Sequence, residues 1–138
     1  HSQTLISLFS QLHVRRIHFR VLQTRSSPGG EGRKSLERML QLKLQAGLID
    51  DAKVHEALRL SDMVLVGCDA LLANEFLNKV GTLAILQQAR QLNKQSFLIA
   101  ESRKKIAHPE WKDELTAHPL FEWVPLHLID ALVSEIKT

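Results

Sequence analysis

The chain has 138 residues, of which 44% are hydrophobic and 24% charged, with 18 Lys+Arg against 15 Asp+Glu. This composition predicts one folded domain and excludes disordered, collagen-like and disulfide-rich proteins. No apolar run approaches the roughly 20 residues that span a membrane, and the single Cys68 has no partner for a disulfide within the chain. We therefore expect a cytoplasmic protein with no membrane partner. Since His1 and not methionine comes first, we also expect residues upstream of it in the complete protein.

Metal binding is not predicted. The seven histidines lack the two-to-five-residue spacing of paired ligands, except for His13 and His18. The helix and strand expected around those two would point their side chains apart. We expect no metal site.

Positive charge is concentrated in residues 1–45, which contain eight basic residues and two acidic ones. Such a region favours a partner that carries phosphate. The chain has no Tyr and no aromatic residue between Phe19 and Phe76, so we expect no direct nucleic-acid contact. A phosphorylated small molecule is the predicted partner. The alternative is that Arg15, Arg16 and Arg38 form an ordinary solvated face.

Hydrophobic periodicity predicts the elements of the first half of the chain. Apolar residues at helical spacing indicate a helix over residues 2–13 with Ser2 as its cap, and an alternating strand over 17–22. The Ser, Pro and Gly cluster at 26–30 indicates a loop. A second helix begins near Arg33, and Gly47 stands where the glycine that ends a helix is expected.

The second half alternates strands with helices. A short helix over 50–60, with Asp50 or Asp51 as its cap, is followed by an apolar run at 63–67. This run is typical of a strand buried on both faces in a parallel sheet. The remaining expected elements are a helix over 79–91, a strand over 96–100 and an amphipathic helix over 129–136. This order predicts an α/β, Rossmann-like, three-layer domain with a mainly parallel sheet of four or five strands, whose ligand lies at the strands' carboxyl ends.

The glycine-rich loop after the first strand matches neither common phosphate motif. Gly32 is followed by Arg33 and not by Lys-Ser, which excludes a P-loop. Ser35 occupies the third glycine position of the dinucleotide fingerprint, so NAD is not supported and no cofactor is expected. Glycines, a helix start and a guanidinium can still bind an anion. The alternative is a simple connection.

Residues 64–82, which read VLVGCDALLANEFLNKVGT, are similar to the signature of a known family. That family joins the alpha, beta and delta subunits of translation initiation factor 2B to ribose-1,5-bisphosphate isomerase and methylthioribose-1-phosphate isomerase. Further resemblances occur in the family's order, and together they cover nearly the whole chain: His1-Ser2, Thr24-Arg25 with Gly32-Arg33, Ala100-Glu101-Ser102, Phe121 to Pro125, and Ile129 to Val133.

The resemblance implies a Rossmann-like carboxy-terminal domain, residues 1–138, that binds a sugar phosphate or nucleotide and pairs into homodimers or with related subunits. It implies that Asp69 is the general acid/base, a role whose proton transfer suits moving a carbonyl between C1 and C2. Alone, Asp69 could equally be a turn cap, and Glu101 a salt-bridge partner. The implied ligand-binding residues are His1, Ser2, Arg25, Arg33, Asn78, Lys79, Gly81, Thr82 and Glu101.

Several positions depart from the family pattern. The isomerases have a catalytic cysteine immediately before their His-Ser pair, and this chain begins at His1, so an amino-terminal helical domain is expected to be missing. Cys68 replaces an alanine, and we interpret it as a small buried side chain and not as a nucleophile. Gln23 and Ser26 replace Glu and Pro. Glu75 replaces the glycine of an Asn-Gly turn, and we expect its charge to weaken anion binding in the pocket.

Two functions stay open. One is a phosphosugar- or nucleotide-binding domain of an aldose-ketose isomerase, and the other is a non-catalytic regulatory subunit of the initiation factor 2B type that acts through protein contacts. For the chain as given we expect no isomerase activity. The apolar segment 121–136 exceeds what one helix stripe can bury, which predicts self-association.

Overall fold

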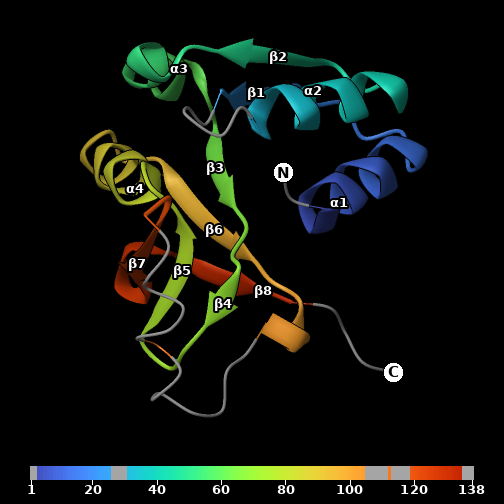
Figure 1. Ribbon diagram of the computed structural model, residues 1–138. Coiled ribbons are helices and arrows are strands. Elements are labelled where there is room, and N and C mark those ends of the chain that lie inside the picture. Colours follow the sequence, from blue (N-terminus) through green and yellow to red (C-terminus); the bar gives the residue numbers. More distant parts are fainter. Residues whose placement is uncertain (1–2, 26–30, 105–111, 113–118, 135–138) are drawn as a thin grey trace. The chain divides into compact units, whose positions relative to one another are not determined.

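The computed structural model describes residues 3–25, 31–104, 112 and 119–134. The chain divides into two compact units, residues 1–60 and 61–138 (Figure 1). The α/β class with parallel strands is confirmed, but the expected single sheet of four or five strands is wrong. The parallel strands form a two-stranded sheet in the first unit and a three-stranded sheet in the second, and the second unit adds an antiparallel sheet that the sequence pattern did not reveal.

The first unit is a two-stranded parallel sheet with helices. Its strands pair with Val21 opposite Ala46, and α2 packs on both of them. Buried Ile6, Phe9 and Met39 form much of its interior. Its elements are α1 (Gln3–Val14), β1 (Val21–Thr24), α2 (Glu31–Gln41), β2 (Ala46–Ile49), the 3-10 turn η1 (Asp51–Lys53) and α3 (Val54–Leu60).

The end of α2 differs from the prediction. Gly47 lies inside β2 and does not end a helix. The left-handed residue that ends α2 is Lys43, at φ 63°, and the amide of Leu44 donates to the carbonyl oxygen of Met39 at 3.0 Å. This bond is the 6→1 contact of a Schellman motif, for which glycine is only the usual residue. β1 also begins at Val21, later than the expected residue 17.

Asp50 caps the helical turn that precedes α3, as predicted. Its Oδ1 accepts a hydrogen bond from the amide of Ala52 at 3.1 Å. Ser2 and the loop at 26–30 lie outside the described residues.

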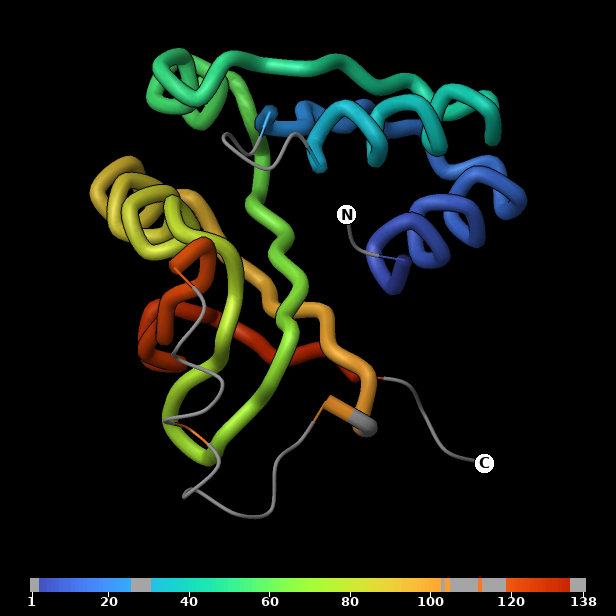
Figure 2. The backbone as a smooth tube through the Cα atoms, in the orientation of Figure 1, coloured from blue at the N-terminus to red at the C-terminus, as the bar shows by residue number. Residues whose placement is uncertain are grey.

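The second unit contains two three-stranded sheets. The parallel sheet has the order β3-β6-β8 and the antiparallel sheet the order β4-β5-β7. Figure 2 shows the chain leaving β3, turning through the β4–β5 hairpin and returning to α4. The elements are β3 (Met63–Val66), β4 (Ala70–Leu71), β5 (Glu75–Lys79), α4 (Thr82–Gln91), β6 (Gln95–Ile99), η2 (Ser102–Lys104), β7 (Phe121–Pro125), η4 (Leu126–Leu128) and β8 (Ala131–Val133).

One apolar core joins both sheets to α4, which packs on β3, β6 and β7. Phe76, Leu86, Leu98 and Val124 are fully buried in it and come from β5, α4, β6 and β7. A core shared in this way fixes the ends of the strands relative to one another.

Three predictions for this unit were wrong. Lys79 ends a strand and does not begin a helix, and α4 starts only at Thr82. The segment 131–133 is a strand and not part of a helix. β3 is not buried on both faces, because Met63 is 51% exposed. The strands expected near 63–67 and 96–100 are confirmed.

The segment on which we base self-association is not one helix, and it is partly covered within its own unit. Residues 121–128 form β7 and η4, and they bury Val124 and Leu128. Leu126 and Ile129 pack against the same core. Leu132 and Val133 of β8 stay exposed, at 49% and 43%. Self-association therefore stays a prediction.

No helix within the described ranges is long and apolar enough to cross a membrane. The same part of the chain contains no group of three or more His, Cys, Asp and Glu residues that could hold a metal ion.

Candidate functional site

Two of the predicted site segments lie at neighbouring strand ends. β3 and β6 are parallel and adjacent, with Val66 opposite Leu98. The chain leaves β3 through Gly67, Cys68 and Asp69, and leaves β6 through Ala100 and Glu101. Because parallel strands end at the same edge of a sheet, the register brings these segments together, and the carboxyl edge of a parallel sheet is where α/β folds bind ligands.

Cys68 lies at this edge with its side chain half-buried against the apolar core. The pKa of its thiol is raised from 9.0 to about 11, mainly by burial and secondly by the negative charge of Asp69, while the positive charge of Lys104 acts in the opposite direction. A thiol with this pKa is protonated at neutral pH and is a poor nucleophile. The interpretation of Cys68 as a small buried side chain is consistent with this environment.

Lys104 is a site residue that the sequence reasoning missed. It belongs to η2, which directly follows β6, and its amide donates to the carbonyl oxygen of Glu101 at 3.0 Å. Its half-buried side chain is close enough to Cys68 to act on the thiol electrostatically. A lysine soon after the expected strand over 96–100 was visible in the sequence, but it did not stand out among the 18 basic residues.

Asp69 is also hydrogen-bonded to β5 across the β4–β5 hairpin. Its amide donates to the carbonyl oxygen of Leu77 at 2.8 Å, and Ala70 is opposite Leu77 in the sheet. Asp69 is exposed, whereas Asn78 and Lys79, which follow Leu77, are half-buried. The structure thus brings together the backbones of Asp69, Asn78 and Lys79.

The turn from β5 to α4, residues Lys79 to Thr82, is held by its own hydrogen bonds. The Oγ1 of Thr82 donates to the carbonyl oxygen of Lys79 at 2.7 Å and accepts from the Nδ2 of Asn78 at 3.1 Å. Since consecutive strand residues point to opposite faces of a sheet, Asn78 and Lys79 present their side chains on different sides of β5.

Glu122 on β7 completes this turn, and it is a second residue that the sequence reasoning missed. Its Oε2 accepts a hydrogen bond from the amide of Gly81 at 2.9 Å. Gly81 has φ 107°, a left-handed conformation that glycine adopts without strain. The Gly81 amide, which the resemblance associates with the ligand, therefore already has a carboxylate acceptor within the chain.

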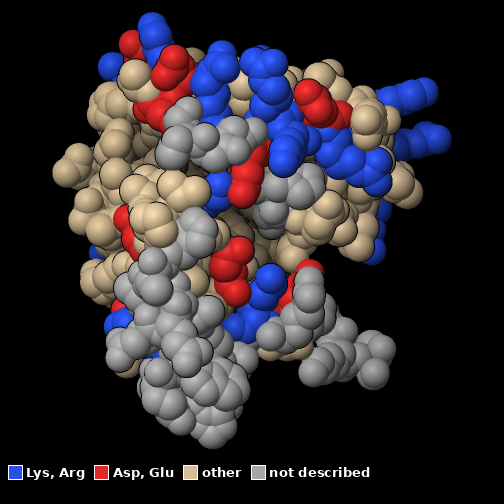
Figure 3. Space-filling view, viewed as in Figure 1, with Lys and Arg blue, Asp and Glu red and all other residues tan. Residues whose placement is uncertain are grey.

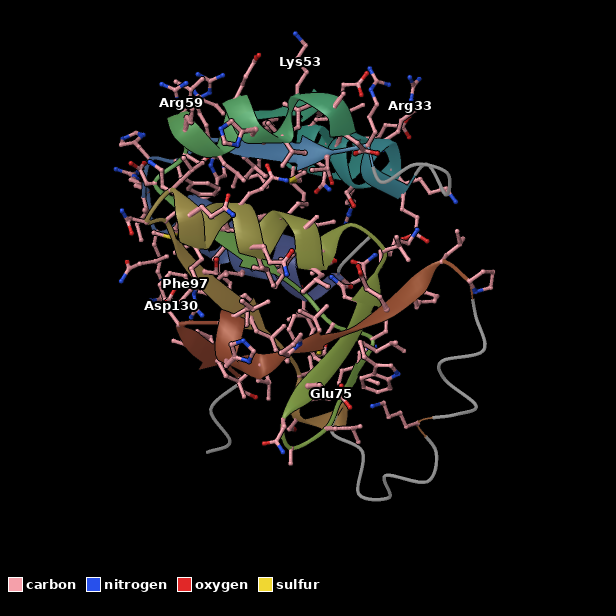
Figure 4. The ribbon with its side chains drawn as sticks, turned by 90° about the vertical axis from the view of Figure 1, so that its left-hand side faces the viewer. Arg33, Lys53, Arg59, Glu75, Phe97 and Asp130 are labelled. Carbon is pink, nitrogen blue, oxygen red and sulfur yellow. The ribbon has the colours of Figure 1, made fainter. Side chains whose placement is uncertain are left out.

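Glu75 does not lie where we expected it. It is the first residue of β5 and Lys79 is the last, so the two are separated by about 13 Å of strand. Figure 4 shows Glu75 at the end of β5 opposite to the one that leads into α4. Its carboxylate is bonded to the ammonium of Lys112, which also lies over the Trp123 ring at 5.5 Å from the centroid. Its charge is thus directed away from the site.

The remaining predicted residues belong to the first unit. Arg25 and Arg33 are both exposed, at the end of β1 and the start of α2. A Cβ on Gly32 would lie 1.8 Å from the carbonyl oxygen of Thr24, so this glycine permits a close backbone contact. The Gly32 amide donates to the carbonyl oxygen of Arg25 at 3.2 Å. His1 and Ser2 lie outside the described residues, and the ligand-binding roles of these four residues stay predictions.

Charge differs between the two units. Residues 1–60 contain ten Lys+Arg and five Asp+Glu, and residues 61–138 contain eight and ten. Figure 3 shows Lys and Arg gathered over the helices of the first unit on the face in view, and Arg33, Lys53 and Arg59 extend from that unit in Figure 4. The basic bias found in the sequence therefore belongs to the first unit.

Comparison with known proteins establishes the family. Residues 1–115 match the Initiation factor 2 subunit family. The chain belongs to this family. It is 23% identical over 158 aligned residues to the ribose 1,5-bisphosphate isomerase of Archaeoglobus fulgidus, an alignment that covers 98% of the chain and 50% of the isomerase. It is 31% identical over 104 residues to translation initiation factor eIF2B subunit alpha of Dictyostelium discoideum, which covers 75% of the chain and 32% of that subunit.

The fold is shared with solved members of the family. The crystal structure of the translation initiation factor eIF-2B of Pyrococcus horikoshii OT3 superposes with a TM-score of 0.88 at 19% identity, covering 96% of this chain and 53% of that one. The chain thus spans half or less of the length of the two curated relatives, one an isomerase and the other an initiation factor subunit. The family resemblance inferred from the sequence is confirmed.

Proposed function

We propose that this chain is a phosphorylated-ligand-binding domain whose site lies at the carboxyl ends of β3 and β6 and at the β5–α4 turn. The observation that carries the proposal is the meeting of Asp69, Glu101 and Lys104 at two adjacent parallel strand ends. The ligand class is a phosphorylated sugar or a nucleotide. Support comes from the family and from its isomerase relative, which is named for a sugar bisphosphate.

The residue types suit this ligand. Lys79 and Lys104 supply positive charge for a phosphoryl group, and the hydroxyls of a sugar can be bound by the carboxylate oxygens of Asp69 and Glu101. Asn78 is proposed to contribute by fixing the turn through its bond to Thr82. Asp69, exposed at the strand end, is the candidate general acid/base. Gly81 and Thr82 hold the turn, and His1, Ser2, Arg25 and Arg33 are proposed to contribute from the first unit. No cofactor is needed for a reaction that only moves a proton between neighbouring carbons.

We propose that the complete protein is an aldose-ketose isomerase of phosphorylated sugars that uses this site. Residues 1–138 are proposed to form its Rossmann-like carboxy-terminal domain. Homodimers or complexes with related subunits in the cytoplasm belong to the same proposal. The alternative is a non-catalytic regulatory subunit that senses a phosphorylated metabolite. The 31% identity to the eIF2B alpha subunit favours that alternative.

Ligand binding is tested by thermal shift and calorimetry on the 138-residue chain with ribose 1,5-bisphosphate, methylthioribose-1-phosphate and AMP. A ligand at 100 times its Kd stabilises the folded state by about 2.7 kcal/mol. We expect stabilisation by at least one of the three, lost in Lys79→Ala and Lys104→Ala.

The matched control is Lys94→Ala, because Lys94 precedes β6 at its amino end and Lys104 follows its carboxyl end. We expect this variant to bind as the wild type does. Equal weakening by Lys94→Ala and Lys104→Ala would show a general charge effect and contradict the proposed position. Turnover of either sugar phosphate by the complete protein then distinguishes the isomerase from the regulatory subunit.

A further inference from the structure

We propose that Glu122 is a positioning residue for this site. Its carboxylate holds the β5–α4 turn in the conformation that presents Lys79 to the ligand. The inference rests on the proposed function, since it names the residue that prepares the same site. Glu122 itself need not touch the ligand.

The turn depends on contacts from outside its own segment. Gly81 adopts φ 107°, and its amide is held by the Oε2 of Glu122 at 2.9 Å. The amide of Val80 donates to the carbonyl oxygen of Leu120 at 2.9 Å. Two consecutive amides of the turn are therefore fixed by residues some 40 positions later in the sequence, one at a backbone carbonyl and one at a side chain.

The position of Glu122 is well determined. It lies opposite Asn78 in the antiparallel pair of β5 and β7, and directly opposite residues share a face of the sheet. Two residues further along β7, Val124 is fully buried opposite Phe76 in the core. The core thus fixes β7, and β7 carries the carboxylate that fixes the turn.

This arrangement has a consequence for the ligand. The Gly81 amide already donates its hydrogen bond to the carboxylate of Glu122. The negative charge of that carboxylate also stabilises the amino end of α4. A phosphoryl group would have to displace Glu122 to use this amide. The phosphate is therefore expected at Lys79 and Lys104, with Glu122 acting only through the turn.

The test compares Glu122→Gln and Glu122→Ala with the wild-type chain. Glutamine keeps an acceptor oxygen and removes the charge, whereas alanine removes both. We expect Glu122→Gln to bind ribose 1,5-bisphosphate within about threefold of the wild type and Glu122→Ala to bind it at least about tenfold more weakly, because small displacements of binding groups cause losses of this order. In the ligand-free protein, faster hydrogen exchange of the Gly81 amide is expected in Glu122→Ala alone.

The control variant is Glu75→Ala, which removes a carboxylate from the opposite end of β5. It should leave both the affinity and the exchange of the Gly81 amide unchanged. Tighter binding by Glu122→Gln than by the wild type would mean that the carboxylate competes with the ligand, and it would overturn the positioning role. Unchanged Gly81 exchange in Glu122→Ala would overturn it as well.

These readouts separate the two proposals. If the wild-type chain binds no phosphorylated sugar, the proposed function fails, and the exchange of the Gly81 amide still reports whether Glu122 holds the turn. If the wild type binds and both Glu122 variants bind equally well, only the positioning role fails.

Discussion

The reactivity of Cys68 tests the electrostatics of the strand ends directly. With a pKa near 11 in place of 9.0, the fraction of thiolate below pH 9 is about 100-fold smaller than for an ordinary cysteine. Cys68 is the only cysteine of the chain, so mass spectrometry after iodoacetamide treatment reports this thiol alone. We expect alkylation of the folded chain to be about 100-fold slower than that of the urea-unfolded chain at the same pH.

Two substitutions assign the cause. Asp69→Asn removes a charge that raises the pKa of the thiol, so alkylation should become faster. Lys104→Gln removes a charge that lowers it, so alkylation should become slower. Opposite signs at one cysteine are not explained by a general loosening of the fold, which would accelerate both variants.

The pH profile separates a raised pKa from simple shielding. A shielded thiol of ordinary pKa would react slowly, but its rate would level off near pH 9. A thiol of pKa about 11 should react tenfold faster for each pH unit up to pH 10. A plateau near pH 9, or equal rates in the folded and unfolded chains, would refute the reasoning.

Other predictions concern stability. Because the pKa of Cys68 is raised in the folded state, unfolding releases a proton between pH 9 and 11, and the free energy of unfolding should fall across that window by up to about 2 to 3 kcal/mol, as urea titration will show. Gly32→Ala should lower the free energy of unfolding by more than about 3 kcal/mol, because its Cβ would lie 1.8 Å from a carbonyl oxygen. The control is Gly47→Ala, whose Cβ would meet only a side-chain atom at 4.0 Å, and it should leave the urea midpoint nearly unchanged. Lys43→Gly should stabilise the chain by roughly 0.5 to 1 kcal/mol, because φ 63° strains any residue with a Cβ; an unchanged melting temperature would contradict this.

Local patterns predicted the elements that are locally determined. The apolar runs that form β3 and β6 and the periodic helix α1 were recognised because burial imposes the pattern on neighbouring residues. The strand ends followed from them, and the ligand was expected at the carboxyl ends of the strands, where Asp69 and Glu101 lie. Asp50 was identified as a cap because capping involves residues two positions apart.

Distant pairing was not predictable from the same patterns. β5 has five residues, of which only Phe76 and Leu77 are buried. Its hydrophobic pattern could therefore not be distinguished from that of the first turn of a helix. What makes Lys79 a strand residue is its pairing with Phe121, 42 positions later. Glu122 carried no signal as a site residue for the same reason, since its partner Gly81 is 41 positions away.

The arrangement of the site bears on the choice between catalysis and sensing. Binding a phosphorylated sugar requires cations and hydrogen-bonding groups, which the second unit supplies through Lys79, Lys104 and the carboxylates of Asp69 and Glu101. Isomerisation also requires a second group that exchanges protons with the substrate, and Cys68 is a poor candidate, because its raised pKa leaves little thiolate at neutral pH. An acid that lacks its partner loses a factor of about 10² to 10⁴ in rate. The 138-residue chain should therefore bind its ligand without measurable turnover, and turnover at a rate comparable to that of the complete protein would place the whole relay within these residues.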